Sequence, residues 1–365
     1  MKPKTLVFYC LDNERETKLS YQEGWVKEFY KNEFFNSSFI NLSDFFTIKR
    51  VLNPNNFKYL FEKFDLIIFL HSAFSNADKI PTIIKKIIKK KKSIKVYFAG
   101  NEYKFLDQKI EFTNFCKIDF FITQCDLQGV IDKYKSVLKA KVYSIPGGGL
   151  DLDYFYPKKE YSERSIDIGF RAYNEPWYFG HQERETLMIA SSKISKELNL
   201  KTDLSMKVED RFNRNEWASF LNNCKSIISS NAGFDYFDTN DNLRNLVIDY
   251  QSQKNGNKDK VFKDIYEKFF KDKDKTIINR QISGRNIESA GTKTLQILIE
   301  GNYRPFLPDV HYIAIKKDLS NLSSCLEKIS DEKFVNKIIN NAYSTALNSL
   351  QFKHHLSRLY KIIYE

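Results

Sequence analysis

The chain has 365 residues, of which 42% are hydrophobic, and it carries a formal net charge of +12 at pH 7. This length accommodates two domains of ordinary size, and 31 Phe with 21 Tyr supply enough apolar surface to exclude a disordered chain. Five scattered cysteines without C-x-x-C spacing predict a reducing compartment and no cysteine metal site.

No apolar run approaches the ~18–20 residues that a bilayer-spanning helix needs. The opening stretch MKPKTLVFYC is too short for a secretory signal and is predicted to form the first strand. We therefore expect a cytoplasmic protein. Basic residues lie in both halves without a recognised motif, so we expect no nucleic-acid partner.

The positive charge is densest in IIKKIIKKKK, residues 83–92. Paired isoleucines at helical spacing predict a helix with one apolar face and one lysine face. Two interpretations stay open. The helix either packs on its own sheet with its lysines in water, or it makes peripheral contact with an anionic membrane, which would place the protein at the inner membrane face.

Short apolar strands alternate with helical stretches through the first half of the chain. Strands are predicted at residues 5–10, 66–70, 95–99, 120–123 and 142–145, and helices at 23–35, 83–92 and 127–138. This spacing predicts a mostly parallel sheet covered on both faces. The proline and glycines of IPGGGLD then interrupt the pattern, so we place an N-terminal Rossmann-like domain at residues 1–155.

The alternation resumes in the second half, which predicts a second doubly wound domain at residues 156–345. Its strands are predicted at 165–169, 203–207, 226–230 and 294–299, its first helices at 183–198 and 215–223, and two closing helices at 331–349 and 352–364. A polar, lysine-rich segment at about 239–278 is predicted to be an inserted helical hairpin. Two such domains, facing each other, form a central cleft at the carboxyl ends of their strands.

The segment ISGRNIESAGTKTLQILIE, residues 282–300, contains the most informative motif. Ser283 or Gly284 can cap a helix, and Arg285 and Glu288 then lie one turn apart on the same face. A helix start with an arginine attracts a phosphate-bearing ligand. The glutamate would instead accept hydrogen bonds from adjacent ribose hydroxyls, so the pair predicts a nucleotide diphosphate site. A surface ion pair is the alternative.

The run RNIESAGTKTLQI, followed by HYIAIKKD, resembles the C-terminal signature of group 1 glycosyltransferases, family 4-like, in the branch that includes CgeB-related polysaccharide-assembly proteins. Weaker resemblances lie in KVYFAGNEYK, IPGGGLDLDYFYP and DIGFRAYNEPWYFG. The resemblance implies a GT-B-like α/β fold, a retaining reaction without a metal cofactor, and a last helix at 346–365 that packs back on the first domain. The family has two glutamates separated by seven residues. Glu288 matches the second, which contacts the donor ribose, whereas Arg280 stands at the first.

The same resemblance assigns further donor-binding residues. Arg171 follows a strand where relatives place an arginine near the donor diphosphate, and Arg211 follows the strand where relatives contact the base. Ser289 and Thr292 could add hydroxyl donors to phosphate from the same helix as Glu288. The alternatives are a surface role for Arg171, and helix capping or packing for Ser289 and Thr292.

Two residues of the first domain are candidates for catalysis. His71 ends the strand LIIFLH, and relatives place a histidine beside the donor sugar and acceptor. Glu102 follows the next strand and could orient an acceptor hydroxyl or accept its proton. A core histidine and a plain turn are the alternative interpretations.

Other motifs are interpreted as structural. Gly147, Gly148 and Gly149 lack a phosphate-loop pattern and are predicted to form an interdomain hinge. Asp151 and Asp153 form a D-x-D triplet in this linker, for which we reject a metal role. The pair His354–His355 has no partner at ligand spacing and is expected at the surface.

Together these features predict a retaining glycosyltransferase that moves a sugar from a nucleotide diphosphate donor to a hydroxyl of a glycan or lipid-linked glycan acceptor. Arg171, Arg285 and a helix N-terminus would stabilise the leaving diphosphate. A non-catalytic glycan- or surface-layer-associated protein that keeps the fold is the alternative, because Arg280 departs from the family pattern.

Overall fold

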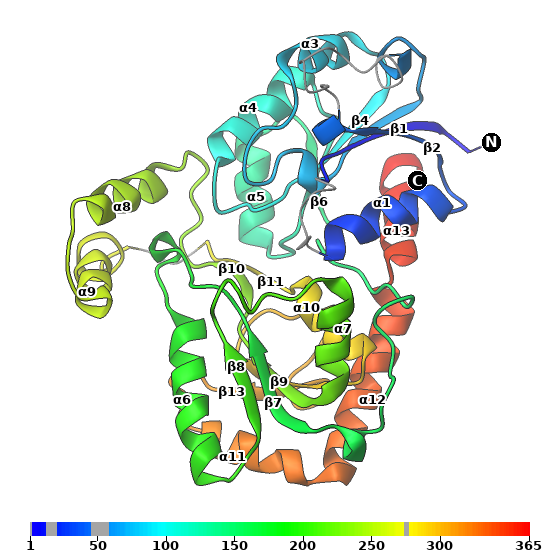
Figure 1. Cartoon of the computed structure of the whole chain (residues 1–365). Coiled ribbons are helices and arrows are strands. Elements are labelled where there is room, and N and C mark those ends of the chain that lie inside the picture. The colour runs from blue at the N-terminus through cyan, green and yellow to red at the C-terminus, as the bar shows by residue number, and fades with distance from the viewer. Residues whose placement is uncertain (1, 12–19, 45–57, 274–276) are drawn as a thin grey trace.

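The computed structural model describes residues 2–11, 20–44, 58–273 and 277–365. The chain forms two lobes stacked one above the other, each built on a parallel sheet with helices on both faces (Figure 1). The predicted fold class, two doubly wound Rossmann-like domains, is confirmed.

The first lobe contains a six-stranded sheet in the order β2-β1-β3-β4-β5-β6, in which every neighbouring pair is parallel. Its strands are β1 (Lys4–Tyr9), β2 (Asn36–Asn41), β3 (Leu66–Phe69), β4 (Ile94–Phe98), β5 (Phe120–Thr123) and β6 (Lys141–Ser144). Its helices are α1 (Ser20–Lys31), α3 (Thr82–Lys90), α4 (Leu106–Cys116) and α5 (Gln128–Val137). All four residues of β3 are buried, as expected for a strand covered on both faces.

The lysine-rich helix α3 packs two of its isoleucines on the sheet of its own lobe, whereas Ile83 is 46% exposed. Ile84 and Ile88 are fully buried in the core that also contains Phe69 and Tyr97. The lysines Lys86, Lys89 and Lys90 lie on the exposed side. Packing explains the apolar side of this helix, and a membrane role for its lysine side stays a prediction. Among the described residues, no helix is both long enough and apolar enough to cross a membrane.

The second lobe contains a five-stranded parallel sheet in the order β13-β12-β9-β7-β8. Its strands are β7 (Ile166–Arg171), β8 (Thr202–Ser205), β9 (Cys224–Ser229), β12 (Leu295–Ile299) and β13 (Ile313–Ile315). Its helices are α6 (Glu183–Glu197), α7 (Arg214–Asn223), α10 (Gly284–Gly291), α11 (Leu322–Glu327) and α12 (Glu332–Ser349). Short 3-10 helices occur at Leu42–Asp44, Lys58–Leu60, His71–Ala73, Tyr161–Glu163, Trp177–Phe179 and Lys328–Ser330.

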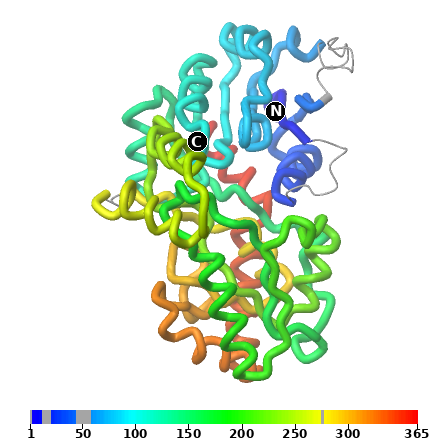
Figure 2. The backbone as a smooth tube through the Cα atoms, turned by 60° about the vertical axis from the view of Figure 1, so that its left-hand side comes forward, coloured from blue at the N-terminus to red at the C-terminus, as the bar shows by residue number. Residues whose placement is uncertain are grey.

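A helical hairpin is inserted into the second lobe between two short antiparallel strands, β10 (Ala232–Phe234) and β11 (Asn279–Gln281). Its helices α8 (Asn242–Ser252) and α9 (Lys258–Phe269) share a small core of their own around Val247 and Ile265. The Asn257 side chain caps α9 by accepting a hydrogen bond from the Asp259 N–H at 2.8 Å. The hairpin projects from one side of the molecule, at the height of the boundary between the lobes (Figures 1 and 2).

The last helix, α13 (Phe352–Tyr364), returns to the first lobe and packs on α1. Phe352 lies 5.4 Å from the ring of Trp25, and Leu356 and Leu359 are fully buried in the same cluster. The two connections between the lobes run side by side, because the Leu150 N–H donates to the Leu350 carbonyl at 2.7 Å.

Candidate functional site

Helix α10 begins at the contact between the two lobes. Asn286 accepts a hydrogen bond from the N–H of the N-cap residue Ser283 at 3.1 Å, which fixes the helix start. The first residue, Gly284, faces Gly148 of the interlobe connection, and a Cβ added to Gly148 would lie 2.5 Å from the Gly284 Cα. Backbone thus meets backbone here, and the helix start is placed at the boundary between the lobes.

This contact predicts an asymmetric effect of two alanine substitutions. Gly148→Ala should push the lobes apart and cost ~1–3 kcal/mol, because the new Cβ overlaps backbone atoms that cannot move alone. Gly284→Ala is the matched control, since its Cβ would have no neighbour closer than 3.8 Å. Small-angle scattering and thermal unfolding should show a larger radius and a lower Tm only for Gly148→Ala. Equal behaviour of the two variants would contradict this account.

Glu288 lies in the interface between the lobes. One carboxylate oxygen accepts a hydrogen bond from the Ser20 hydroxyl of α1 in the first lobe, and the other accepts from the Trp217 indole N–H of α7 at 2.8 Å. The residue is only 4% exposed, and this burial raises the pKa of its carboxyl. The position that the sequence motif assigned to a ribose ligand is therefore at the interlobe boundary.

Arg285 lies one turn before Glu288 and is half-buried. Its guanidinium lies 5.7 Å from the Trp217 ring, and it forms no hydrogen bond or ion pair with any residue that the structure describes. Burial and repulsion from Arg184 lower the pKa of Arg285 to about 10. The Glu288 carboxylate attracts this cation, but no carboxylate among the described residues lies at ion-pair distance from it. A half-buried cation in this setting, beside a second cation, has the electrostatics of an anion-binding site.

Arg184 is a member of this site that the sequence analysis missed. It lies in the first turn of α6 and is 8% exposed, with its Nε 3.5 Å from the Glu175 carboxylate. Its guanidinium lies 4.7 Å from the Tyr173 ring centre. The sequence could have identified Arg184 by its position at the start of a predicted helix, because the same feature identified Arg285.

Arg171 and Arg211 are placed differently from Arg184 and Arg285. Arg171 donates to the Asp203 carboxylate at 2.7 Å, and its guanidinium lies 4.6 Å from the Phe220 ring. These partners hold it on the sheet. Arg211 is exposed, with its guanidinium 6.0 Å from the Tyr173 ring. Donor binding by either arginine stays a prediction.

Ser289 and Thr292 direct their hydroxyls at the backbone of their own helix. Ser289 donates to the Arg285 carbonyl at 2.7 Å, and Thr292 lies 3.1 Å from the Ser289 carbonyl. Both residues are fully buried. These contacts correspond to the packing alternative, and a contact with phosphate stays untested.

His71 is buried among aromatic rings of the first lobe. Its ring lies 5.6 Å from Trp25 and 5.2 Å from Phe98, and neither ring nitrogen has a hydrogen-bond partner among the described residues. Burial, with a smaller contribution from His355, lowers the pKa of His71 to about 3. A role beside the donor sugar stays a prediction, and it would require this enclosed ring to become accessible.

The expectation that His354–His355 lies at the surface is wrong for His355, which is 3% exposed. Its ring lies 5.8 Å from Trp25 in a stacked geometry, and its Nε2 lies 3.0 Å from the Gly148 carbonyl. Burial lowers the pKa of His355 to about 4. Trp25 donates its indole N–H to the Gly147 carbonyl at 2.7 Å, so α1 and α13 together fix the glycine-rich connection.

Glu102 is 3% exposed and has a full set of internal partners. It accepts hydrogen bonds from Thr123 and Tyr134, each at 2.6 Å, and from the Gln124 N–H at 2.8 Å. Burial raises the pKa of its carboxyl. These hydrogen bonds connect the ends of neighbouring strands and explain why Glu102 is buried. Its role in catalysis stays a prediction.

The D-x-D triplet forms ion pairs across the lobe boundary. Asp151 binds Lys27 of α1 at 2.9 Å and Arg214 of α7 at 2.6 Å, and Asp153 also pairs with Lys27. Within the described ranges, no group of three or more His, Cys, Asp or Glu side chains is arranged to hold a metal ion. These aspartates therefore hold basic side chains from both lobes.

Arg280, at the family's first glutamate position, lies in β11 and is 7% exposed. It donates to Asp235 at 2.7 Å and to Glu183 of α6 at 3.0 Å. Arg280 thus ties the short β10–β11 ribbon to the start of α6. These bonds to two carboxylates give Arg280 a role in holding the fold together.

Comparison with solved structures supports the architecture. The chain resembles Anabaena HepE in complex with UDP-glucose (TM-score 0.56, 9% identity, 99% of each chain covered) and sucrose-phosphate synthase from Thermosynechococcus elongatus (TM-score 0.55, 9% identity, 99% of each chain). It also resembles the N-terminal domain of Candida albicans trehalose-6-phosphate phosphatase (TM-score 0.54, 8% identity, 98% of this chain and 96% of that one). No protein-family profile and no curated protein sequence matches the chain. The whole chain therefore has a GT-B-like fold, with Glu288 and Arg285 at the boundary between its two lobes.

Proposed function

We propose that this protein is a retaining glycosyltransferase that transfers a sugar from a nucleotide diphosphate donor to a hydroxyl of a cell-surface glycan or glycolipid. The observation that carries the proposal is the Arg285 guanidinium, which is half-buried beside Arg184 and has no carboxylate at ion-pair distance among the described residues. A diphosphate supplies the missing negative charge. The UDP and UDP-glucose complexes of the similar HepE fold support a nucleotide-sugar ligand.

The proposed chemistry depends on stabilisation of charge. When the bond between the sugar and the phosphate breaks, negative charge grows on the leaving diphosphate, and Arg184 and Arg285 stabilise it. The electron pair of the broken bond leaves with the phosphate, and the acceptor hydroxyl forms the new bond to the anomeric carbon. The leaving phosphate takes the acceptor proton. Two guanidinium groups can supply the positive charge at this position, so we propose a reaction without a metal cofactor.

Glu288 would bind the nucleotide ribose. In the structure its two carboxylate oxygens accept hydrogen bonds from Ser20 and Trp217. We propose that the lobes separate to admit the donor, and that a ribose hydroxyl then takes the place of the Ser20 hydroxyl. We also propose that the enzyme works in the cytoplasm, with the lysine face of α3 toward the inner membrane surface when the acceptor is lipid-linked.

A panel of UDP-, GDP-, ADP- and CMP-sugars tests the proposal directly. One class of donor should stabilise the protein against thermal unfolding, by ~2.7 kcal/mol at a concentration 100 times its Kd. Calorimetry then gives the affinity, and NMR of the transfer product gives the anomeric configuration. The absence of binding by every donor would contradict the proposal and favour a non-catalytic protein with this fold.

Two substitutions at one hydrogen bond separate the role of Glu288 in binding from its role in lobe contact. Glu288→Ala should weaken donor binding ~10- to 150-fold, because a hydrogen bond to a charged group contributes about 1.5–3 kcal/mol. Ser20→Ala breaks the same interlobe bond but keeps the carboxylate, so donor affinity should stay within about twofold of the original. Calorimetry with the best donor measures both values. Equal losses in the two variants would assign Glu288 to lobe contact alone.

A further inference from the structure

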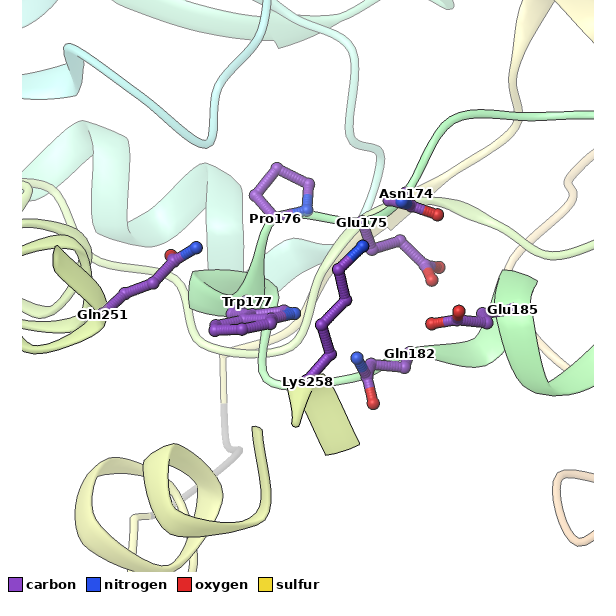
Figure 3. A pocket seen from close by; sticks show the side chains of 8 residues that line it. All are labelled: Asn174, Glu175, Pro176, Trp177, Gln182, Glu185, Gln251 and Lys258. Carbon is purple, nitrogen blue, oxygen red and sulfur yellow. The ribbon is translucent and has the colours of Figure 1, made fainter. Parts of the chain in front are cut away.

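A pocket of about 360 Å³ lies between the inserted hairpin and the segment that joins β7 to α6 (Figure 3). One wall is formed by residues 174–177 and by Gln182 and Glu185 at the start of α6. The other wall is formed by Gln251 of α8 and Lys258 of α9. This volume falls within the ~300–1,000 Å³ typical of small-ligand sites. The pocket exists only because the hairpin is present.

The side chains of this pocket match a sugar. Trp177 lines it with a partly exposed indole, whose ring centre lies 6.4 Å from that of Phe262. The side chains of Gln182, Glu185, Gln251 and Lys258 form no hydrogen bond or ion pair with other described residues. Lys258 extends across the pocket toward the 174–177 segment (Figure 3).

The chemistry of this lining selects an uncharged polyol. An aromatic face packs against the C–H face of a sugar ring, and amide, ammonium and carboxylate groups offer donors and acceptors to its hydroxyls. The free charges of Lys258 and Glu185 balance each other, which disfavours a polyanion. We propose that this pocket binds a saccharide unit of the acceptor glycan, on the hairpin side of the lobe boundary.

The pocket adjoins the anion site through a shared wall. Glu175 lines the pocket, and its carboxylate accepts a hydrogen bond from the Arg184 N–H at 3.0 Å. Arg184 in turn repels Arg285. A glycan held by Trp177 would therefore lie on the side of Glu175 opposite the proposed diphosphate site. This inference rests on the proposed glycosyltransferase function.

Direct binding of neutral trisaccharides to the full-length protein tests the site. The probes are glucose-, galactose- and N-acetylglucosamine-based trisaccharides, with tryptophan fluorescence and calorimetry as readouts. The chain has three tryptophans, so Trp177→Phe identifies the signal from this one. At least one probe should bind. Trp177→Ala should weaken its binding 10-fold or more, whereas Trp177→Phe should stay within about threefold.

A second pair of variants distinguishes the loss of a contact with the ligand from a general loosening of the hairpin. Gln251→Ala should weaken trisaccharide binding at least threefold, and Gln253→Ala, which changes the same residue type outside the pocket, should leave it unchanged. Donor binding should be the same in all these variants. Lack of binding by every trisaccharide, or equal binding by Trp177→Ala and the unmodified protein, would overturn the pocket assignment while donor binding persists. Loss of donor binding in the unmodified protein would instead reject the proposed function.

Discussion

Replacing Arg285 by alanine is expected to lower turnover by ~100- to 1,000-fold while leaving the folded protein as stable as before, or more stable. The loss of turnover follows because a preorganised positive group at a developing charge contributes about 3–4 kcal/mol to transition-state stabilisation. The gain in stability follows because the substitution removes a half-buried cation that is repelled by Arg184 and has no carboxylate at ion-pair distance among the described residues. Steady-state kinetics and urea unfolding measure the two quantities.

Arg280→Ala provides the matched control for Arg285→Ala. Arg280 is itself buried and forms ion pairs with both Asp235 and Glu183, so the substitution breaks two buried ion pairs at once. We expect it to lose about 3–5 kcal/mol of stability. The opposite pattern, a stable Arg280→Ala and an unstable Arg285→Ala with normal turnover, would show that Arg285 supports the fold rather than an anionic ligand.

Acidification from pH 7.5 to pH 5 is expected to remove about 4 kcal/mol of stability through His71 and His355. In the folded protein the pKa of His71 is lowered to about 3 and that of His355 to about 4, whereas both titrate near pH ~6.5 in the unfolded chain. The unfolded chain therefore binds more protons below pH ~6.5, and stability falls as the pH drops from there toward the folded values. Each histidine costs about 2 kcal/mol at pH 5.

The double variant His71→Phe/His355→Gln isolates this effect. Phenylalanine suits the aromatic surroundings of His71, and glutamine can still donate to the Gly148 carbonyl. Urea unfolding between pH 7.5 and pH 5 should show an acid loss about 4 kcal/mol smaller than that of the unmodified protein. Burial raises the pKa values of Glu102 and Glu288, which act in the opposite direction in both proteins and cancel in the comparison.

The sequence predicted those strands and helices that have a clear apolar pattern of their own. The run LIIF identified β3, and the expected helix at 352–364 matches α13. Elements without a strong apolar pattern were missed. Strand β2 reads NSSFIN and lies at the edge of its sheet, where polar residues are tolerated, and the short strands β10 and β11 have three residues each.

The site was predictable only where its residues are close in the sequence. Arg285 and Glu288 belong to one helix turn, so their spacing identified them together. Arg184 comes close enough to repel Arg285 only through the fold of the second lobe, and no sequence spacing records that proximity. His355 was assigned to the surface because its burial depends on the return of α13 to the first lobe. Both Arg184 and His355 were misjudged because their surroundings depend on long-range packing, which local patterns in a single sequence do not record.

The return of α13 to the first lobe also sets the order of events during synthesis. One wall of the core around Trp25 consists of Phe352, Leu356 and Leu359. The ribosome must add about 200 residues between the end of the first sheet and this wall, which takes on the order of 10 to 40 s at ~5–20 residues per second. During that interval the nascent N-terminal half exposes the apolar groove that α13 later fills, and is open to chaperone capture and to aggregation.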